Sequence, residues 1–157
     1  YKDEVEDKDR IVTGWGASLS GIWQFAENTS LYFQGVYGKG ISNYIQDISG
    51  TGLDLVPSAT AEGKLKAFCA WGGYMGFSHN WNKVLTSNIM YSYARVLDRY
   101  GMPATSYKYA QYAAANLFWD FSEYGSCAIE YVFGRRNDFN KDYGNASRIN
   151  TMIQYRF

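Results

Sequence analysis

Hydrophobic and polar residues alternate along seven segments of this sequence, as they do in β-strands that have one apolar and one polar face. In the last segment, Ile149, Ile153 and Phe157 fall on one face while Arg148 and Arg156 fall on the other. The seven predicted strands cover about 11–25, 30–41, 63–78, 83–99, 107–121, 125–136 and the C-terminal stretch that ends at Phe157. The pattern predicts an all-β, antiparallel fold.

The predicted strands are long, and most of them have 12 to 16 residues. Strands of soluble proteins usually have about 5–6 residues, whereas a tilted membrane-spanning strand needs about 9–11 within the hydrocarbon and can extend beyond it. Lipid on one side and water on the other would account for the two faces. We therefore expect a transmembrane β-barrel. A large antiparallel sheet in a soluble protein is the alternative that alternation alone leaves open.

The predicted connections alternate in length. Short turns fall near 27–29, 79–82 and 122–124, and longer loops at 42–62, 100–106 and 137–146. Outer-membrane barrels have this asymmetry, with short periplasmic turns and longer external loops. The loop 42–62 is long enough to fold into the barrel as a constriction.

Aromatic residues make up 18% of the chain and gather at the strand ends that flank the short turns. Tyr and Trp are enriched at membrane–water interfaces because their rings are apolar and their tips polar. We expect an interfacial girdle made of Trp23, Phe25, Phe77, Trp81, Trp119, Phe121, Tyr155 and Phe157.

Counting strands back from Phe157 places the first strand's start on the long-loop side. Single-chain bacterial barrels have an even number of strands, whereas seven are predicted. We therefore expect residues 1–157 to be a single domain that forms the C-terminal portion of a longer barrel, with 1–10 in an external loop. An eighth strand hidden in 42–62 is the alternative.

Charge and composition exclude several classes of protein. The chain has 15 basic and 15 acidic residues, so no basic excess is available to neutralise nucleic-acid phosphates. No apolar run is long enough for a transmembrane helix. Cys69 and Cys127 have no metal-ligand spacing and fall on apolar faces, where a disulfide is possible but unsupported.

The sequence contains no nucleophile elbow, phosphate-binding loop or metal-ligand pattern. The one histidine, His79, lies in a predicted turn beside Trp81, where hydrogen bonding is its expected role. We expect no enzyme activity, no metal and no cofactor. Charged residues on the polar faces are instead candidates for a pore lining, which sets solute preference; they are Lys64, Lys66, Lys108, Asp120, Glu130, Arg136, Arg148 and Arg156.

Basic residues outnumber acidic ones in this set, which predicts a mild preference for anions. The alternative is that these side chains are merely solvated or paired across strands. We expect Glu130 to pair with a neighbouring arginine.

Several short segments also occur in a characteristic order. They are GWG at 14–16, YGKGI at 37–41 followed by NYI at 43–45, HNW at 79–81, ANLFW at 115–119, EYVFGRR at 130–136 and QYRF at 154–157. Together they resemble the C-terminal half of the DcaP-like family of bacterial porins. The resemblance implies a barrel of about sixteen strands in the outer membrane of a Gram-negative bacterium. It also implies a trimer that passes small, often anionic, solutes.

The expected function is therefore that of a porin for passive diffusion of small solutes. The expected partners are outer-membrane lipid, the solutes, further copies of the chain and the barrel-assembly machinery, which would act on the C-terminal strand. The alternatives are an outer-membrane barrel with a filled lumen that serves as an adhesin or anchor, and a soluble ligand-binding barrel.

Overall fold

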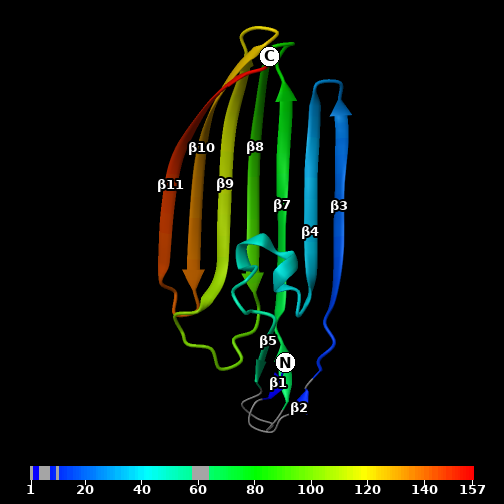
Figure 1. The fold of residues 1–157 in the computed structure, drawn as a ribbon, viewed down its shortest axis with the longest axis vertical. Coiled ribbons are helices and arrows are strands. Elements are labelled where there is room, and N and C mark those ends of the chain that lie inside the picture. The colour runs from blue at the N-terminus through cyan, green and yellow to red at the C-terminus, as the bar shows by residue number, and fades with distance from the viewer. Residues whose placement is uncertain (1, 4–7, 10, 58–63) are drawn as a thin grey trace.

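The fold is one open antiparallel sheet of seven long strands, as Figure 1 shows for this computed structural model. The structure describes residues 2–3, 8–9, 11–57 and 64–157. The sheet runs in chain order through β3 (Trp15–Ala26), β4 (Thr29–Lys39), β7 (Cys69–Asn80), β8 (Leu85–Val96), β9 (Tyr107–Asp120), β10 (Gly125–Asp138) and β11 (Tyr143–Tyr155). The predicted all-β antiparallel fold is confirmed. Strands β3 and β11 form the two edges of the sheet.

Short elements gather at the end of the sheet opposite the short turns (Figure 1). They are β1 (Lys2–Asp3), β2 (Lys8–Asp9), the 3-10 helices η1 (Ser42–Tyr44) and η2 (Gln46–Ile48), β5 (Leu55–Pro57) and β6 (Leu65–Ala67). Strand β5 pairs with β6 and not with the large sheet, so it is not the missing eighth strand. Of the predicted external loop, residues 1, 4–7 and 10 lie outside the described part. None of the described helices has the length and apolarity needed to cross a membrane.

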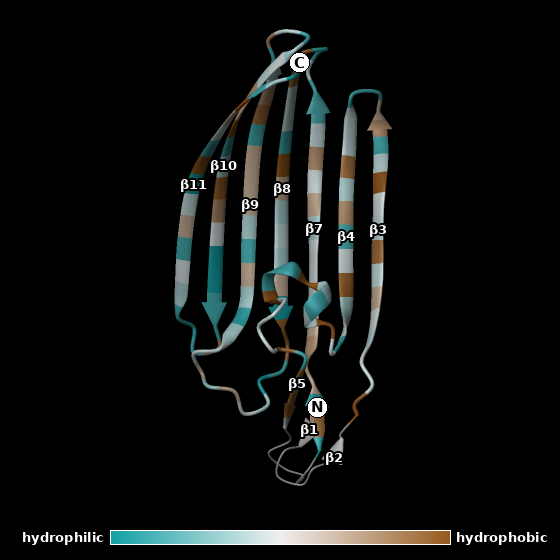
Figure 2. Ribbon diagram, in the orientation of Figure 1, coloured by the Kyte–Doolittle hydropathy of each residue, from teal (hydrophilic) through white to brown (hydrophobic). Residues whose placement is uncertain are grey.

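The strand register divides the sheet into two chemically different faces. One row across all seven strands contains Trp23, Leu31, Phe77, Ile89, Ala115, Tyr131 and Ile149. The next row points the other way and contains Gln24, Ser30, Ser78, Asn88, Asn116, Glu130 and Asn150. We call the faces that carry these rows the outward and inward faces. The alternating brown and teal bands in Figure 2 follow this period of two.

The buried core lies at the long-loop end, between the inward face and the loop after β4. The loop contributes Ile41, Ile45, Ile48, Leu53 and Phe68, and the strands contribute Ala70, Ala94, Val96 and Tyr107. Ile48 and Val96 have no exposed surface. The segment predicted as a long loop at 42–62 is therefore anchored to the inward face in its described part, by apolar contacts that the polar appearance of its sequence conceals.

The predicted strand at 63–78 is wrong in its first part. It is interrupted at Phe68, which is buried against the loop core, and only Cys69–Asn80 joins the large sheet. Lys64 precedes β6 and Lys66 lies within it, so neither lysine belongs to the seven-stranded wall. Burial of the Phe68 ring stabilises the break, because a Phe side chain gains about 1.5–3 kcal/mol on burial.

The prediction of a long loop at 137–146 is also wrong. Strands β10 and β11 continue to Asp138 and start again at Tyr143, which leaves a turn of residues 139–142. Lys141 adopts a positive φ of 73° in this turn, and the Asp138 backbone N–H donates to the Asp142 carbonyl across it at 2.9 Å. Of the polar residues that suggested a loop, Asn137 and Asp138 end β10 and Asn145 lies in β11, while Asn140, Lys141 and Asp142 form the turn. The other two long connections are present.

Candidate functional site

A continuous polar row crosses the inward face and is partly tied together by side-chain hydrogen bonds. The Asn88 amide donates to the Asn116 amide oxygen at 2.7 Å, and the Asn150 amide donates to Glu130 Oε1 at 2.8 Å. The Asn116 amide reaches Glu130 Oε2 at 3.4 Å. Glu130 is therefore held by two amides, and the expected pairing with an arginine is wrong. The register explains this, because the cross-strand neighbours of Glu130 are asparagines.

Most of the predicted pore-lining charges share this inward face. Lys108 and Asp120 stand at opposite ends of β9, Arg136 near the end of β10 and Arg148 in β11. Arg136 Nε donates to Asp138 Oδ1 at 2.9 Å, so its charge is compensated locally. Arg156 follows β11 and lines a small hollow with Asp120 at the short-turn end. The strands bring these residues to one surface but spread them along its height.

Lys66 has a different environment from the one expected. Its ammonium group lies 5.2 Å from the centre of the Tyr100 ring, which itself packs on Phe68 at 5.5 Å. Burial raises the pKa of the Tyr100 hydroxyl above its usual value, and the nearby Asp98 carboxylate raises it further. The neutral Tyr100 side chain offers its ring to the cation.

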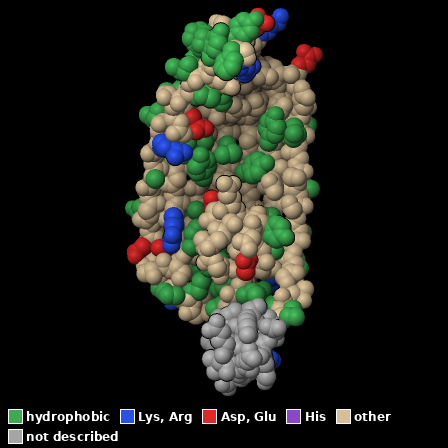
Figure 3. Space-filling view, viewed as in Figure 1, with side chains coloured by type: hydrophobic (Ala, Val, Ile, Leu, Met, Phe, Trp, Pro, Cys, Tyr) green, Lys and Arg blue, Asp and Glu red, His purple; other side chains and the backbone are tan. Residues whose placement is uncertain are grey.

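Two glycines on the inward face make room for the loop. A Cβ at Gly16 would come within 3.0 Å of Ile41 Cγ2, and a Cβ at Gly72 would come within 3.0 Å of Ile45 Cγ2. The isoleucines thus rest directly on the strand backbones. Figure 3 shows this side of the molecule, in which the loop projects over a trough between the outer strands. The loop narrows the space in front of the wall at the long-loop end.

The described part of the loop has its own framework of hydrogen bonds. The Asp54 carboxylate accepts from the Ser42 backbone N–H at 2.7 Å and from the Asn43 amide at 3.2 Å. Gly50 and Gly52 adopt positive φ values of 73° and 74°, which residues with a Cβ rarely tolerate. These features hold η1 and η2 against the wall in one conformation.

A hollow of about 570 Å³ separates the loop from the wall. The wall side presents Gln34, Tyr74, Ser92 and Tyr112, and the loop side presents Tyr44, Gln46 and Asp47. Residues with hydroxyl, amide and carboxylate groups therefore line the hollow from both sides.

The eight aromatic residues predicted as a girdle are exposed and lie toward the short-turn end of the sheet. Trp23 packs on Phe25 at 5.8 Å, Phe25 on Phe77 at 5.7 Å and Trp119 on Phe121 at 5.9 Å. The other members, Trp81, Tyr155 and Phe157, are each more than half exposed.

Neither the histidine nor the thiols form a reactive site. His79 Nδ1 lies 2.8 Å from the Thr29 hydroxyl, so the hydrogen-bonding role expected of it is confirmed. Cys69 and Cys127 are free thiols. Within the described ranges, no group of three or more His, Cys, Asp or Glu side chains is placed to hold a metal ion.

A solved structure shares this arrangement of strands. The crystal structure of the outer membrane channel DcaP of Acinetobacter baumannii matches with a TM-score of 0.77 and 20% sequence identity. This chain therefore has the fold of part of that channel. The alignment covers 98% of this chain and 43% of that chain, so this chain spans less than half the channel's length. No family model matches this sequence, and no curated protein matches it.

The match supports, at the level of fold, the resemblance seen in the sequence motifs. The sequence allowed the loop to fold inward by its length alone, without indicating its apolar contacts with the wall, and the unbroken polar row was missed. The row could have been found, because strand alternation places polar residues such as Gln24 and Glu130 opposite the apolar positions of their strands. The register of β8 supplies the link between them through Asn88.

Proposed function

We propose that this chain forms part of the wall of a channel in the outer membrane of a Gram-negative bacterium, through which small hydrophilic solutes diffuse passively. The observation that carries the proposal is the pair of adjacent rows, one apolar and one polar, which cross all seven strands. Soluble proteins rarely expose an apolar surface of this extent. Lipid against the outward face and water against the inward face would satisfy both rows, and such transport needs no catalytic group.

The two edge strands indicate how the barrel is completed. Strands β3 and β11 both run from the long-loop end to the short-turn end, because an odd number of strands lies between them and each strand is antiparallel to its neighbours. Joining them directly would create a parallel pair, so antiparallel closure requires an odd number of additional strands. An open edge facing lipid is not viable. Seven strands over 43% of the channel's length fit a barrel of about sixteen strands, of which this chain would supply the C-terminal portion.

The first test is single-channel recording on the full-length protein in planar bilayers. We expect stepwise conductance of a water-filled pore, because the inward face lines a trough that the described loop narrows without covering. Stable insertion without any conductance would contradict the proposal and favour a barrel with a filled lumen. We further propose, from the resemblance alone, that three copies of the barrel form a trimer. We also propose that the barrel-assembly machinery acts on the C-terminal strand.

We propose a mild preference for anions, moderated by the loop. Lys108, Arg148 and Arg156 outweigh Asp120 and Glu130 on and beside the wall. The loop opposes them through the negative charges of Asp47, which is exposed, and Asp54, whose carboxylate accepts hydrogen bonds from neutral donors and keeps its charge.

The variant Asp47→Asn is expected to raise the ratio of anion to cation permeability by about two-fold, because it removes a fixed negative charge from the narrowed region. Reversal potentials in a salt gradient measure this ratio. Asp142→Asn, in the exposed β10–β11 turn, is the matched control and should leave the ratio unchanged. A wild-type channel that prefers cations would contradict the assignment.

A further inference from the structure

The outward face carries three charged side chains within its seven strands, and all three are basic. They are Lys39 of β4, Arg95 of β8 and Arg135 of β10, and each lies near the long-loop end of its strand. Arg95 lies two strands from Lys39, and Arg135 lies two strands from Arg95. At each step the strand register places the basic residue two positions further from the long-loop end. The outward residues of these strands near the short turns include no charge. The two ends of this face therefore differ in electrostatic character.

Trp and Tyr side chains surround these basic groups and form a second aromatic belt. Trp71 stacks on Tyr93 at 4.9 Å, Tyr93 stacks on Tyr109 at 5.4 Å, and Trp15 packs on Tyr37 at 5.7 Å. On β9, Tyr109 and Trp119 are ten residues apart. That is about 34 Å along the strand, or about 26 Å across a membrane at the usual tilt, which matches the apolar band of such barrels. The basic residues thus lie at the height of lipid head groups.

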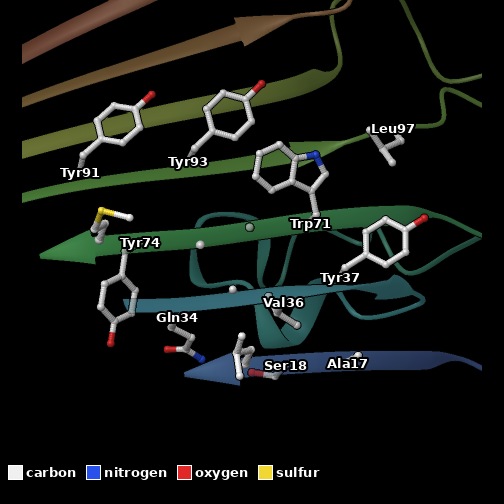
Figure 4. Close-up of a pocket in the computed structure, with 15 residues that line it drawn as sticks. Ala17, Ser18, Gln34, Val36, Tyr37, Trp71, Tyr74, Tyr91, Tyr93 and Leu97 are labelled. Carbon is white, nitrogen blue, oxygen red and sulfur yellow. The ribbon is translucent and has the colours of Figure 1, made fainter. Parts of the chain in front are cut away.

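An apolar groove of about 1000 Å³ starts beside Arg95 and runs toward the middle of the outward face. Its floor is made of Gly35 and Gly73, which pair directly between β4 and β7, and of Ala17, which lies two residues along β3 from the partner of Gly35. Larger side chains border it, and Figure 4 shows Tyr91, Tyr93, Trp71 and Tyr37 around the opening. A groove of this shape and polarity fits a hydrocarbon chain.

Arg95 is half-buried on the outward face, beside the Tyr93 side chain. Its Nε is enclosed and has no hydrogen-bond partner within the described residues, so an anion would reach the terminal nitrogens of the guanidinium. Arg135 is engaged by the Asn137 amide oxygen at 3.2 Å and by the Tyr143 ring at 4.2 Å. The acidic side chain near this belt, Asp98, accepts the Cys69 backbone N–H at 3.0 Å. Arg95 and the exposed Lys39 therefore remain as the belt's groups for a ligand.

We propose that this part of the outward face binds a phosphorylated membrane lipid. The lipid phosphate contacts Arg95, with Lys39 and Arg135 adding charge, and one acyl chain lies in the adjacent groove. Arginine suits phosphate because its planar donors form paired hydrogen bonds. The inference rests on the proposed membrane function, since it requires lipid against this face.

Spin-labelled lipids test the inference directly on the full-length protein in phosphatidylcholine vesicles. Electron spin resonance measures the immobilised fraction of labelled phosphatidic acid and of labelled phosphatidylcholine. We expect the protein to prefer phosphatidic acid about five-fold or more, since each basic residue near the surface contributes about that factor. The triple variant Lys39→Gln, Arg95→Gln, Arg135→Gln should bring the preference close to one. Arg148→Gln, on the inward face, is the control and should leave it unchanged.

Three outcomes would overturn the inference: equal binding of both lipids by the wild type, an unchanged preference in the triple variant, or a smaller oligomer with an unchanged preference. The last would show that this face contacts another copy of the chain. Arg95→Gln alone should also lower the preference for phosphatidic acid, and this single variant replaces the triple variant in the test if the latter fails to fold. A channel that inserts and conducts but shows no preference refutes this inference alone, whereas a protein that does not insert refutes the proposed function as well.

Discussion

Ile89→Arg is expected to destabilise the membrane-inserted protein by about 2–4 kcal/mol, the cost of a cationic side chain on a lipid-facing strand near the bilayer midplane. Ile89 is 62% exposed on the outward face, between Phe77 and Ala115. It lies midway along β8, between the two aromatic belts. Urea titration of the protein folded into lipid vesicles, followed by tryptophan fluorescence, measures the free energy of unfolding.

Gly134→Arg is the matched control, because it adds the same side chain to the other face. Gly134 lies on the inward face, and a Cβ there would meet no atom within 4 Å. We expect little change in stability, together with a shift of ion selectivity toward anions. Equal destabilisation by both variants would show that the two faces do not see lipid and water as proposed.

Ile48→Asp is expected to release the loop from the wall and to raise single-channel conductance. Ile48 has no exposed surface and packs among Ile45, Leu53 and Tyr107. A carboxylate cannot be buried there without a partner, and its desolvation costs several kcal/mol. The released loop would leave the trough, and limited proteolysis would cut it faster. Single-channel recordings and digestion time courses measure the two effects.

Tyr44→Asp is the control for this second variant, since it introduces the same charge into the same loop. Tyr44 is 79% exposed and takes no part in the apolar cluster. The loop should stay docked, with conductance and cleavage near those of the wild type. If Ile48→Asp also behaves like the wild type, the docked loop does not limit the pore.

The strand pattern was largely predictable, because each long strand has one face whose polarity is imposed by its surroundings. Period two in β9 or β11 is visible without any partner strand. The least regular strand, β8, owes its ambiguity to Arg95 and Ser87, which are polar residues on the outward face. Pairing with β7 and β9 fixes the register of β8.

The boundaries of the loops were not predictable to the same extent. Polar residues at 137–146 have the composition of a loop, yet several of them extend β10 and β11. Lys64 and Lys66 alternate with Leu65 and Ala67 like wall residues, yet Lys66 lies in β6, which pairs with β5 outside the wall, and Lys64 precedes it. In both places, pairing and burial at distant positions outweigh local composition.

The sequence by itself determined the antiparallel strands, the two faces and the aromatic residues that flank the short turns, because side chains alternate with a fixed period along any strand. Only the tertiary structure decided which asparagines hold Glu130, where the loop packs, and that three basic residues share one end of the outward face. These features depend on the register between strands and on contacts across a loop of many residues. Neither is encoded in the local period of a single strand.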